Sequence, residues 1–232
     1  MTEPAYADDA TAEAFAALVR SRHSIRGFRP DPVPEELLQK VFEDARWAPS
    51  GTNVQPWHVL VASGATRDAL RAGFLERFDA GVDQNRDHRS DGKTPGVWMD
   101  RKRACARAMY GAMGIEWEDR PGRQRAARRN YELFDAPHVV FFGMHETFGL
   151  ATAADIGIYA QTLMLSMTAN GLASCPQGTL AAWPDFTREV FGLDPEIKIL
   201  FGLSFGFEDP DMAVNTARTE RATVAESVTF RS

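Results

Sequence analysis

Apolar residues near the start of the chain recur at the spacing of a helix. Phe15, Leu18 and Val19 give the segment after Thr11 one apolar face. This pattern ends at a polar, arginine-rich turn over residues 21–27. We therefore expect a first helix that stops where a cluster of cations begins.

A second helix is predicted where Pro34 precedes Glu35 and Glu36. Proline suits the first turn of a helix, and carboxylates there meet the positive end of the helix dipole. The apolar residues that would face the core share one stripe: Leu37, Val41, Phe42 and Ala45.

Three apolar runs predict strands: HVLVAS at 58–63, APHVVFFGMHE at 136–146 and IKILFGLSFGF at 197–207. The second run is continuously apolar, as expected for a central strand that is covered on both faces. Helices are predicted after the first run, through Leu70, Phe74 and Phe78, and over residues 151–172, where Gly171 would stop the helix.

The middle and the end of the chain are polar. Residues 83–96 read as a loop, residues 101–113 as a basic helix, and residues 215–230 as an extended tail. The sequence predicts one domain over residues 15–232 after an N-terminal tail at 1–14, with a variable helical or lid segment at about 77–130.

Composition narrows the function classes. The chain has 232 residues, of which 44% are hydrophobic and 25% charged, as in an ordinary globular protein. A formal net charge of -6 argues against a general nucleic-acid binder, because phosphate affinity depends mainly on excess Lys and Arg. The acidic N-terminus has no signal-like apolar run, and nothing approaches the length of a membrane span, so we expect a cytoplasmic protein without a membrane partner.

Neither thiols nor imidazoles form a recognisable site. Cys105 lies in the basic helical stretch and Cys175 in an apolar turn, without the spacing of a zinc site or a disulfide framework. The five histidines are scattered, and lone histidines are more often structural than catalytic. We predict no metal and assign no catalytic residue.

Two basic clusters are the main candidates for chemistry. RSRHSIRGF brings several cations to one turn, and Arg218 and Arg221 lie in the tail. Charge-assisted hydrogen bonds from such groups suit a phosphate or a carboxylate. A solvated turn and a frayed terminus would explain the same residues. The chain has no Rossmann GxGxxG after a strand and no P-loop, so a nucleotide-like ligand would be held in another way.

RHSIRGF followed by ARWAPSGTNVQPWHVLV resembles the N-terminal signature of the nitroreductase family of flavoproteins. DAPHVVFF, ADIGIYAQTLMLSMTANGLASCPQG, ILFGLSFGFED and the arginine-containing tail resemble the remaining family blocks, in family order, from about residue 15. Residues 77–130 look most like the nitrobenzoate-reductase-type subgroup. The resemblance implies an α+β fold in which helices flank a central, mostly antiparallel sheet, and an intertwined homodimer with FMN at its interface.

The resemblance also implies the site. Arg22, His23 and Ser24 would contact the FMN phosphate, and Arg26 would approach the pyrimidine edge of the flavin ring. Asn130 would face the ring. The other implied contacts fall into three groups: Pro49, Ser50, Gly51 and Asn53 from the other subunit; Pro176, Gln177 and Gly178 at the N5 and O4 edge; and Arg218 and Arg221 at the phosphate. Thr219 stands where some relatives carry lysine, so which tail arginine is the main ligand stays open.

The implied activity is transfer of electrons from NAD(P)H, through flavin N5, to nitroaromatic or quinone-like acceptors by a ping-pong mechanism. The partners would be a second copy of the chain and a small aromatic acceptor. Two alternatives remain: a specialised flavin enzyme of the same fold, such as a reductive dehalogenase, a heterocycle dehydrogenase or a flavin-degrading enzyme, and a non-catalytic FMN storage protein. The physiological substrate and the choice between NADH and NADPH cannot be read from the sequence.

Overall fold

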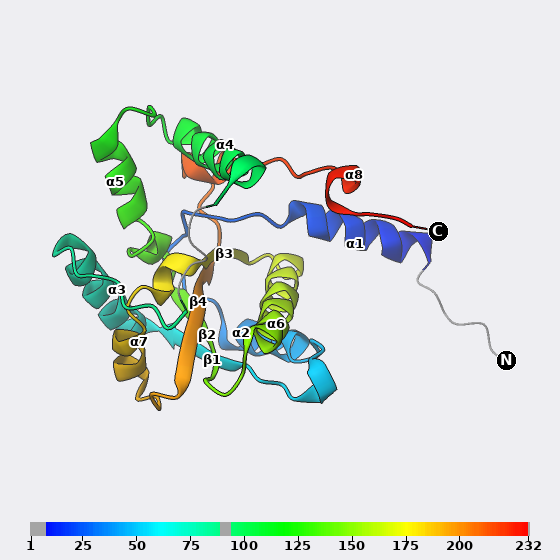
Figure 1. Ribbon diagram of the computed structural model, residues 1–232, viewed down its shortest axis with the longest axis horizontal. Helices are drawn as coiled ribbons and strands as arrows, with labels where there is room; N and C mark the ends of the chain where they lie inside the picture. The colour runs from blue at the N-terminus through cyan, green and yellow to red at the C-terminus, as the bar shows by residue number, and fades with distance from the viewer. Residues whose placement is uncertain (1–7, 89–93, 232) are drawn as a thin grey trace.

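The computed structural model describes residues 8–88 and 94–231. Its centre is a four-stranded sheet in the order β1-β2-β4-β3, with every pairing between these strands antiparallel (Figure 1). The strands are β1 (His58–Ser63), β2 (His138–His145), β3 (Ala173–Gln177) and β4 (Ile197–Gly206). This architecture confirms the predicted α+β class with an antiparallel sheet.

Helices account for most of the remaining described chain. They are α1 (Asp9–Ser21), α2 (Glu35–Ala45), α3 (Gly64–Asp79), α4 (Gly96–Ala112), α5 (Arg120–Arg128), α6 (Leu150–Ala169), α7 (Pro184–Phe191) and α8 (Val224–Ser227). The predicted helices after Thr11, after Pro34, through Phe74, over 101–113 and over 151–172 are all present. Gly171 ends the last of these with a φ of 75°, in the left-handed region that favours glycine.

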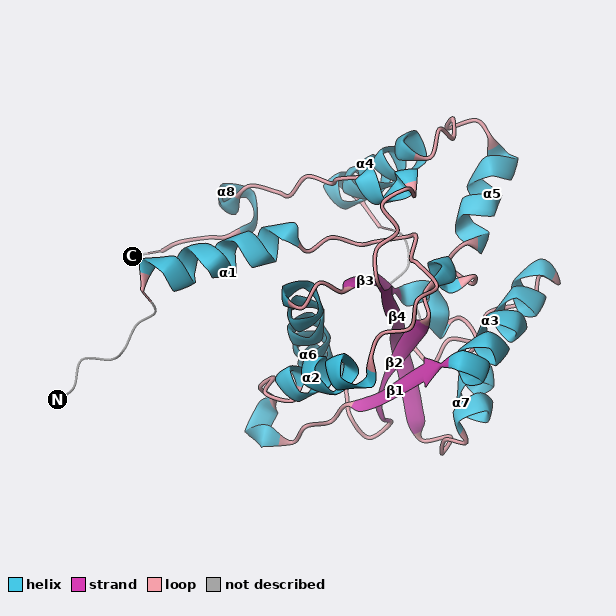
Figure 2. Cartoon of the chain, turned by 180° about the vertical axis from the view of Figure 1, so that it is seen from behind, coloured by secondary structure: helices cyan, strands magenta, loops and turns pink. Residues whose placement is uncertain are grey.

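The sheet separates two apolar layers, with α2 and α6 over one face and α3 and α7 over the other (Figure 2). Alternate residues of β2 pack into the two layers. Val140 and Phe142 lie in the layer under α2 and α6, and Val139 and Phe141 lie in the layer under α3 and α7. All four side chains are fully buried. Burial on both faces is why this strand is continuously apolar in sequence.

The elements β3, α5 and α7 were not predicted from the sequence. Residues around Cys175, expected to form a turn, are instead the strand β3, in which Pro176 is tolerated because β4 is the one strand of the sheet that pairs with β3, which lies at the sheet edge. Helix α5 was missed because its sequence, RPGRQRAAR, has no apolar stripe; Asp119 caps it through the Gly122 amide. Helix α7 lies in a stretch for which no structure was predicted.

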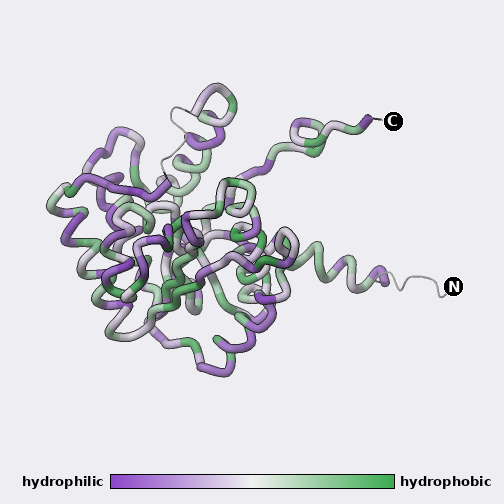
Figure 3. Tube along the Cα trace, turned by 60° about the horizontal axis from the view of Figure 1, so that its bottom comes forward, coloured by the Kyte–Doolittle hydropathy of each residue, from purple (hydrophilic) through white to green (hydrophobic). Residues whose placement is uncertain are grey.

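The apolar face predicted for the first helix is not buried within the chain. None of the residues of α1 is buried, and the side chains of Phe15 and Val19 are 61% and 40% exposed. Helix α1 and the segment that contains α8 extend away from the body (Figure 3). The tail, predicted to be extended over residues 215–230, contains α8 and the end of the short 3-10 helix η4 (Ala213–Thr216).

The variable segment at 77–130 contains α4 and α5. Of the loop predicted at 83–96, residues 89–93 lie outside the described residues, as do residues 1–7 of the N-terminal tail. Among the described helices, none is long and apolar enough to cross a membrane.

Candidate functional site

The turn that follows α1 lies against the edge strand β3. Ser24 forms a bridge with Ser174, and the Ile25 amide donates a 3.1 Å hydrogen bond to the Ser174 carbonyl. The side chain of Ile25 is buried, which anchors the turn in the core. The predicted residues Arg22, His23 and Ser24 are therefore held at one end of the sheet.

The tail reaches the same place through Asn215, a buried residue of η4. Its Oδ1 accepts a 2.7 Å hydrogen bond from the Arg26 amide, and its Nδ2 donates to the carbonyls of Gly27 and Asp209, each at 2.9 Å. Asn215 was not predicted as a site residue, because its partners Arg26 and Gly27 lie almost 190 positions away along the chain and no local pattern indicates them. This contact explains how cations from both ends of the chain come together.

The cations meet without a carboxylate between them. Burial lowers the pKa of Arg22 and the positive charge of Arg221 lowers it further, so the two guanidinium groups lie within electrostatic range of each other. Within residues 8–88 and 94–231, none of the predicted arginines of this cluster pairs with an acidic side chain: Arg22, Arg26, Arg218 and Arg221.

A phosphate fits this cluster. The side chains of Arg218 and Arg221 donate only to nearby groups of the tail. The buried Nε2 atom of His23 has no hydrogen-bond partner within the described chain. Like charges held together and a buried nitrogen without a partner are costly unless an anion lies among them. The cluster therefore has the composition of a site for a dianion.

A second group of predicted residues meets at the other end of β3. The side-chain amide of Gln177 makes two hydrogen bonds. Its Nε2 donates to the Asn130 carbonyl at 2.9 Å, and its Oε1 accepts from the Ser204 hydroxyl at 2.5 Å. Thr179 donates to Asn130 Oδ1 at 3.3 Å. Gly178 follows directly, and a Cβ built on it would meet nothing within 4 Å, so a flat ligand has room to approach this backbone.

The cationic cluster and the group around Gln177 are separated along β3 by three residues of extended strand, or about 10 Å. Ser174 marks the cationic end and Gln177 the end at which Asn130 lies. A ligand with a phosphate at one end and a ring system at the other matches this arrangement.

Arg26, the sixth residue of the turn over residues 21–27, lines a cavity of about 200 Å³. Its Nη1 donates to the Ser24 carbonyl at 3.3 Å. The cavity lies between α4, α5 and η4, and apart from Arg26 and Arg129 its lining is apolar: Met109, Met113, Ala126, Phe134, Met212, Ala213 and Val214. The expected approach of Arg26 to a pyrimidine edge stays a prediction.

Pro49, Ser50, Gly51 and Asn53 lie far from the cationic cluster of the same chain. The Gly51 amide donates to Asp155 near the start of α6, whereas the end of α6 leads into β3 and the cluster. From Asp155 to Asn170 the helix rises about 22 Å. One chain therefore carries these residues at a distance from Arg22, as expected if they serve the site of another subunit; that assignment remains a prediction.

The remaining reactive residues are structural. Burial raises the pKa of Cys175 to about 11 despite the nearby Arg26 and Arg22, so this thiol is protonated, whereas Cys105 is exposed. The described residues contain no cluster of potential metal ligands. Residues 202–206, GLSFG, match the GxSxG spelling of a nucleophile elbow, but Ser204 is fully buried within β4. An elbow requires an exposed serine at a strand-to-helix turn.

The fold and site define a class of protein: an α+β chain in which a cationic cluster lies at one end of the edge strand β3 of an antiparallel sheet and the hydrogen bonds of Gln177 lie at the other end. Residues 19–207 match the model of the nitroreductase family, and the chain belongs to this family.

Similar proteins cover nearly the whole chain. Nitroreductase NfnB of Mycolicibacterium smegmatis is 40% identical over 220 residues, which is 94% of this chain and 93% of NfnB. A 4-nitrobenzoate reductase of a Nocardioides species is 32% identical over 225 residues, covering 94% and 90% of the two chains. The crystal structure of FMN-dependent NfnB from Mycobacterium smegmatis in complex with NADPH superposes with a TM-score of 0.91 at 38% identity, covering 96% of this chain and all of that one. The predicted family and its nitrobenzoate-reductase-type subgroup are confirmed.

Proposed function

We propose that this chain is an FMN-dependent oxidoreductase that takes electrons from NAD(P)H and passes them to nitroaromatic or quinone-like acceptors in a ping-pong cycle. The observation that carries the proposal is the convergence of arginines from both ends of the chain without a neutralising carboxylate. It is supported by relatives described as an FMN-dependent nitroreductase in complex with NADPH and as a 4-nitrobenzoate reductase. The compartment proposed is the cytoplasm.

In this proposal the cationic cluster holds the cofactor by its phosphate. Arg22, His23 and Ser24 act with the tail arginines Arg218 and Arg221. His23 Nδ1 lies 2.7 Å from the Ser21 carbonyl, and the buried Nε2 atom has no hydrogen-bond partner within the described chain, so in this proposal Nε2 is the atom of His23 that contacts the phosphate.

At the other end, the backbone of residues 176–178 meets the reacting edge of the ring. Ser204 and Asn130 fix the side chain of Gln177, so the peptide that follows it is already oriented. Bound FMN supplies the reversible acceptor of a hydride. The protein contributes preorganised donors and a nearby cation, Arg26, which stabilise negative charge as it develops.

No side chain is needed as a covalent nucleophile in this proposal. Cys175 is buried and protonated, and Ser204 is committed to Gln177. The catalytic contribution of the chain is then binding, orientation and electrostatics.

We further propose that the working unit is a homodimer. The loop of Pro49, Ser50, Gly51 and Asn53 would complete the site of the partner subunit. The exposed apolar residues of α1 and of the tail, among them Phe15 and Phe230, support a partner surface there, since their side chains are 61% and 81% exposed.

An anaerobic titration tests the activity. The purified protein is expected to be yellow, and its flavin absorbance is expected to bleach on addition of NADPH or NADH and to return on addition of 4-nitrobenzoate, nitrobenzene or a quinone. Bound flavin that neither nucleotide bleaches would support the storage alternative. Bleaching without reoxidation by any of these acceptors would favour a specialised flavin enzyme, and absence of flavin binding would reject the proposal.

A further inference from the structure

The segment over residues 83–88, here called the strap, follows α3 within the variable segment and contacts η3 (Gly178–Ala181) and α7. The Asp83 carbonyl accepts a 3.1 Å hydrogen bond from the Trp183 indole, and the Asn85 amide donates to the Ala182 carbonyl at 3.0 Å. The Asn85 side chain also contacts Asp185. The strap is therefore fixed by polar contacts over its length.

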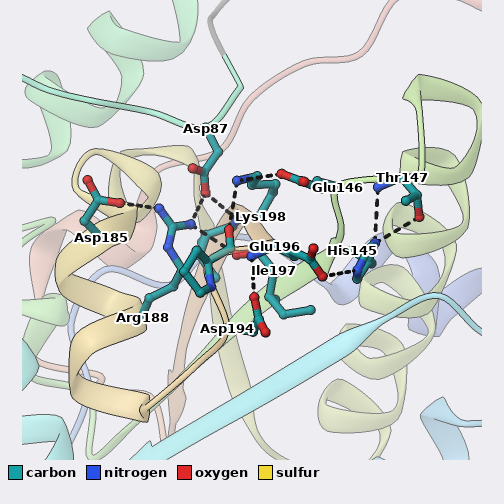
Figure 4. Close-up of polar contacts among 12 residues, drawn as sticks. Asp87, His145, Glu146, Thr147, Asp185, Arg188, Asp194, Glu196, Ile197 and Lys198 are labelled. Atoms are coloured by element: carbon teal, nitrogen blue, oxygen red, sulfur yellow. Dashed lines mark hydrogen bonds and ion pairs between the residues drawn. The ribbon is translucent and has the colours of Figure 1, made fainter.

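Its strongest attachment is an ion pair that is almost completely buried. Asp87 Oδ2 lies 2.6 Å from Arg188 Nη1, and the two side chains are 9% and 10% exposed (Figure 4). The same carboxylate oxygen accepts a 2.8 Å hydrogen bond from the Ile199 amide of β4. Arg188 also contacts Asp185, but removal of Arg188 would leave the buried carboxylate of Asp87 without its cation, so this attachment holds the strap in one place.

The residue before this anchor is brought to the ring-facing end of the site. Arg86 Nη1 donates a 2.6 Å hydrogen bond to the Gly178 carbonyl, and Nε donates to Gln84 at 2.9 Å. The charge of Arg86 also opposes the rise that burial causes in the pKa of Tyr131. Within residues 8–88 and 94–231, the side-chain hydrogen bonds of Arg86 go to neutral oxygens, those of Gly178 and Gln84.

We infer that Arg86 is a positioning residue for the flavin edge: it fixes the Gly178 peptide group and adds a positive charge there, while Asp87 and Arg188 hold it in place. This inference rests on the proposed function, because it needs FMN beside residues 176–178. A cation at this edge favours the anionic reduced flavin over the neutral oxidised flavin. The variable segment would thus tune the cofactor from outside the family's motifs.

The test is the midpoint potential of protein-bound FMN, together with the affinity of the apoprotein for oxidised FMN. In Arg86→Gln the reduced cofactor is expected to bind about tenfold more weakly relative to the oxidised cofactor, which for a two-electron couple lowers the potential by about 30 mV. The affinity for oxidised FMN should change less than threefold, or about 0.7 kcal/mol. Arg86→Lys retains the charge and should restore most of the potential.

Asp87→Asn separates the effect of position from the effect of charge. Loss of a negative charge by itself would raise the potential, whereas release of Arg86 from Gly178 would lower it. A fall in the potential therefore supports the strap. Asn85→Ala loosens the strap without leaving a buried charge unpaired, so this variant replaces Asp87→Asn if that protein does not fold. Asn85→Ala should lower the midpoint potential as well.

Lys198→Gln is the matched control, because it removes a cation about 13 Å along β4 from Gly202, the partner of Gln177.

The outcomes distinguish the two proposals. Wild-type protein that binds no FMN would reject the proposed function. Wild-type protein that binds FMN, with a potential unchanged in Arg86→Gln or lowered equally in Lys198→Gln, would overturn the role of Arg86 alone. A potential that rises or stays constant in both Asp87→Asn and Asn85→Ala would overturn the role of the strap.

Discussion

Arg22 and Arg221 illustrate how residues from the two ends of the chain would form the one anion site that we propose. Each was a weak signal in sequence, because an exposed turn and a polar terminus commonly carry arginine. Their proximity changes the interpretation, since the charge of Arg221 lowers the pKa of Arg22. Cations that repel each other and pair with no acidic side chain within residues 8–88 and 94–231 favour an anion-binding site over a solvated surface.

Removal of either arginine should weaken FMN binding. One lost charge-assisted contact costs about 1.5–3 kcal/mol, so Arg22→Ala and Arg221→Ala should each raise the dissociation constant about 10- to 150-fold. Titration of apoprotein with FMN, followed by flavin fluorescence, measures this change. Arg20→Ala, which removes an exposed cation from the last turn of α1, is the control and should bind FMN normally. Normal affinity in both site variants would mean that the phosphate lies elsewhere.

Arg26 is expected to tune the cofactor more than to hold it. Arg26→Gln removes a cation from the proposed pyrimidine edge, where the reduced flavin is anionic and the oxidised flavin is neutral. The midpoint potential should fall by about 30 mV for each 1.4 kcal/mol lost, while flavin content stays high. Spectroelectrochemistry of the purified variant checks this. Loss of FMN together with an unchanged potential would place Arg26 at the phosphate instead.

At the scale of elements, His138 joins three segments. Its Nε2 accepts a 2.9 Å hydrogen bond from the Val33 amide ahead of α2, and its Nδ1 lies 2.5 Å from the Ser63 hydroxyl at the end of β1. A nitrogen that accepts cannot also be protonated, so the folded state requires the neutral ring with its proton on Nδ1. Burial lowers the pKa of this histidine in agreement with that geometry.

Stability should consequently fall in mild acid. The unfolded chain binds the His138 proton more tightly, with a pKa near 6.5, so the contribution of His138 is fully present above that value and is lost as the pH falls below it. Urea unfolding at several pH values from about 7.5 to about 5.5 should show a slope of up to about 1.4 kcal/mol per pH unit. His138→Gln should be less stable near neutrality and should have a flatter profile; an equal slope in the variant would contradict this role.

At the scale of the molecule, the single chain separates the predicted cofactor contacts. The loop at Gly51 lies near the start of α6 and the cationic cluster near its end, about 22 Å apart along the helix. The outer residues of α1 and the tail are exposed. A second copy of the chain would bring the two half-sites together and cover these apolar side chains.

Dimerisation and FMN binding should therefore be linked. We expect a homodimer that buries well over about 2,000 Å², with FMN lost when the subunits separate. Light scattering over a dilution series, read together with the fluorescence of released flavin, measures both events. A stable monomer that retains FMN would contradict the two-chain site.

Local patterns were sufficient for most elements and for the family. The run of β2 is continuously apolar because both faces of this strand are buried. The Pro-Glu-Glu start of α2 suits the positive end of the helix dipole, and the glycine after α6 suits a left-handed backbone. The site motifs at residues 22–26 and 176–178 are likewise contiguous, so they could be recognised without knowledge of their partners.

Long-range contacts were decided only by the tertiary structure. Strand β3 has a weak pattern because it is short and contains proline, and pairing with β4 alone makes it a strand. Asn215, Arg86 and Asp87 have no local signature; their roles come from hydrogen bonds to backbone groups that are remote in sequence. The sequence by itself determined which segments carry apolar runs or stripes and which carry charge. Only the fold decided which charges meet, because the meeting depends on contacts between segments far apart along the chain.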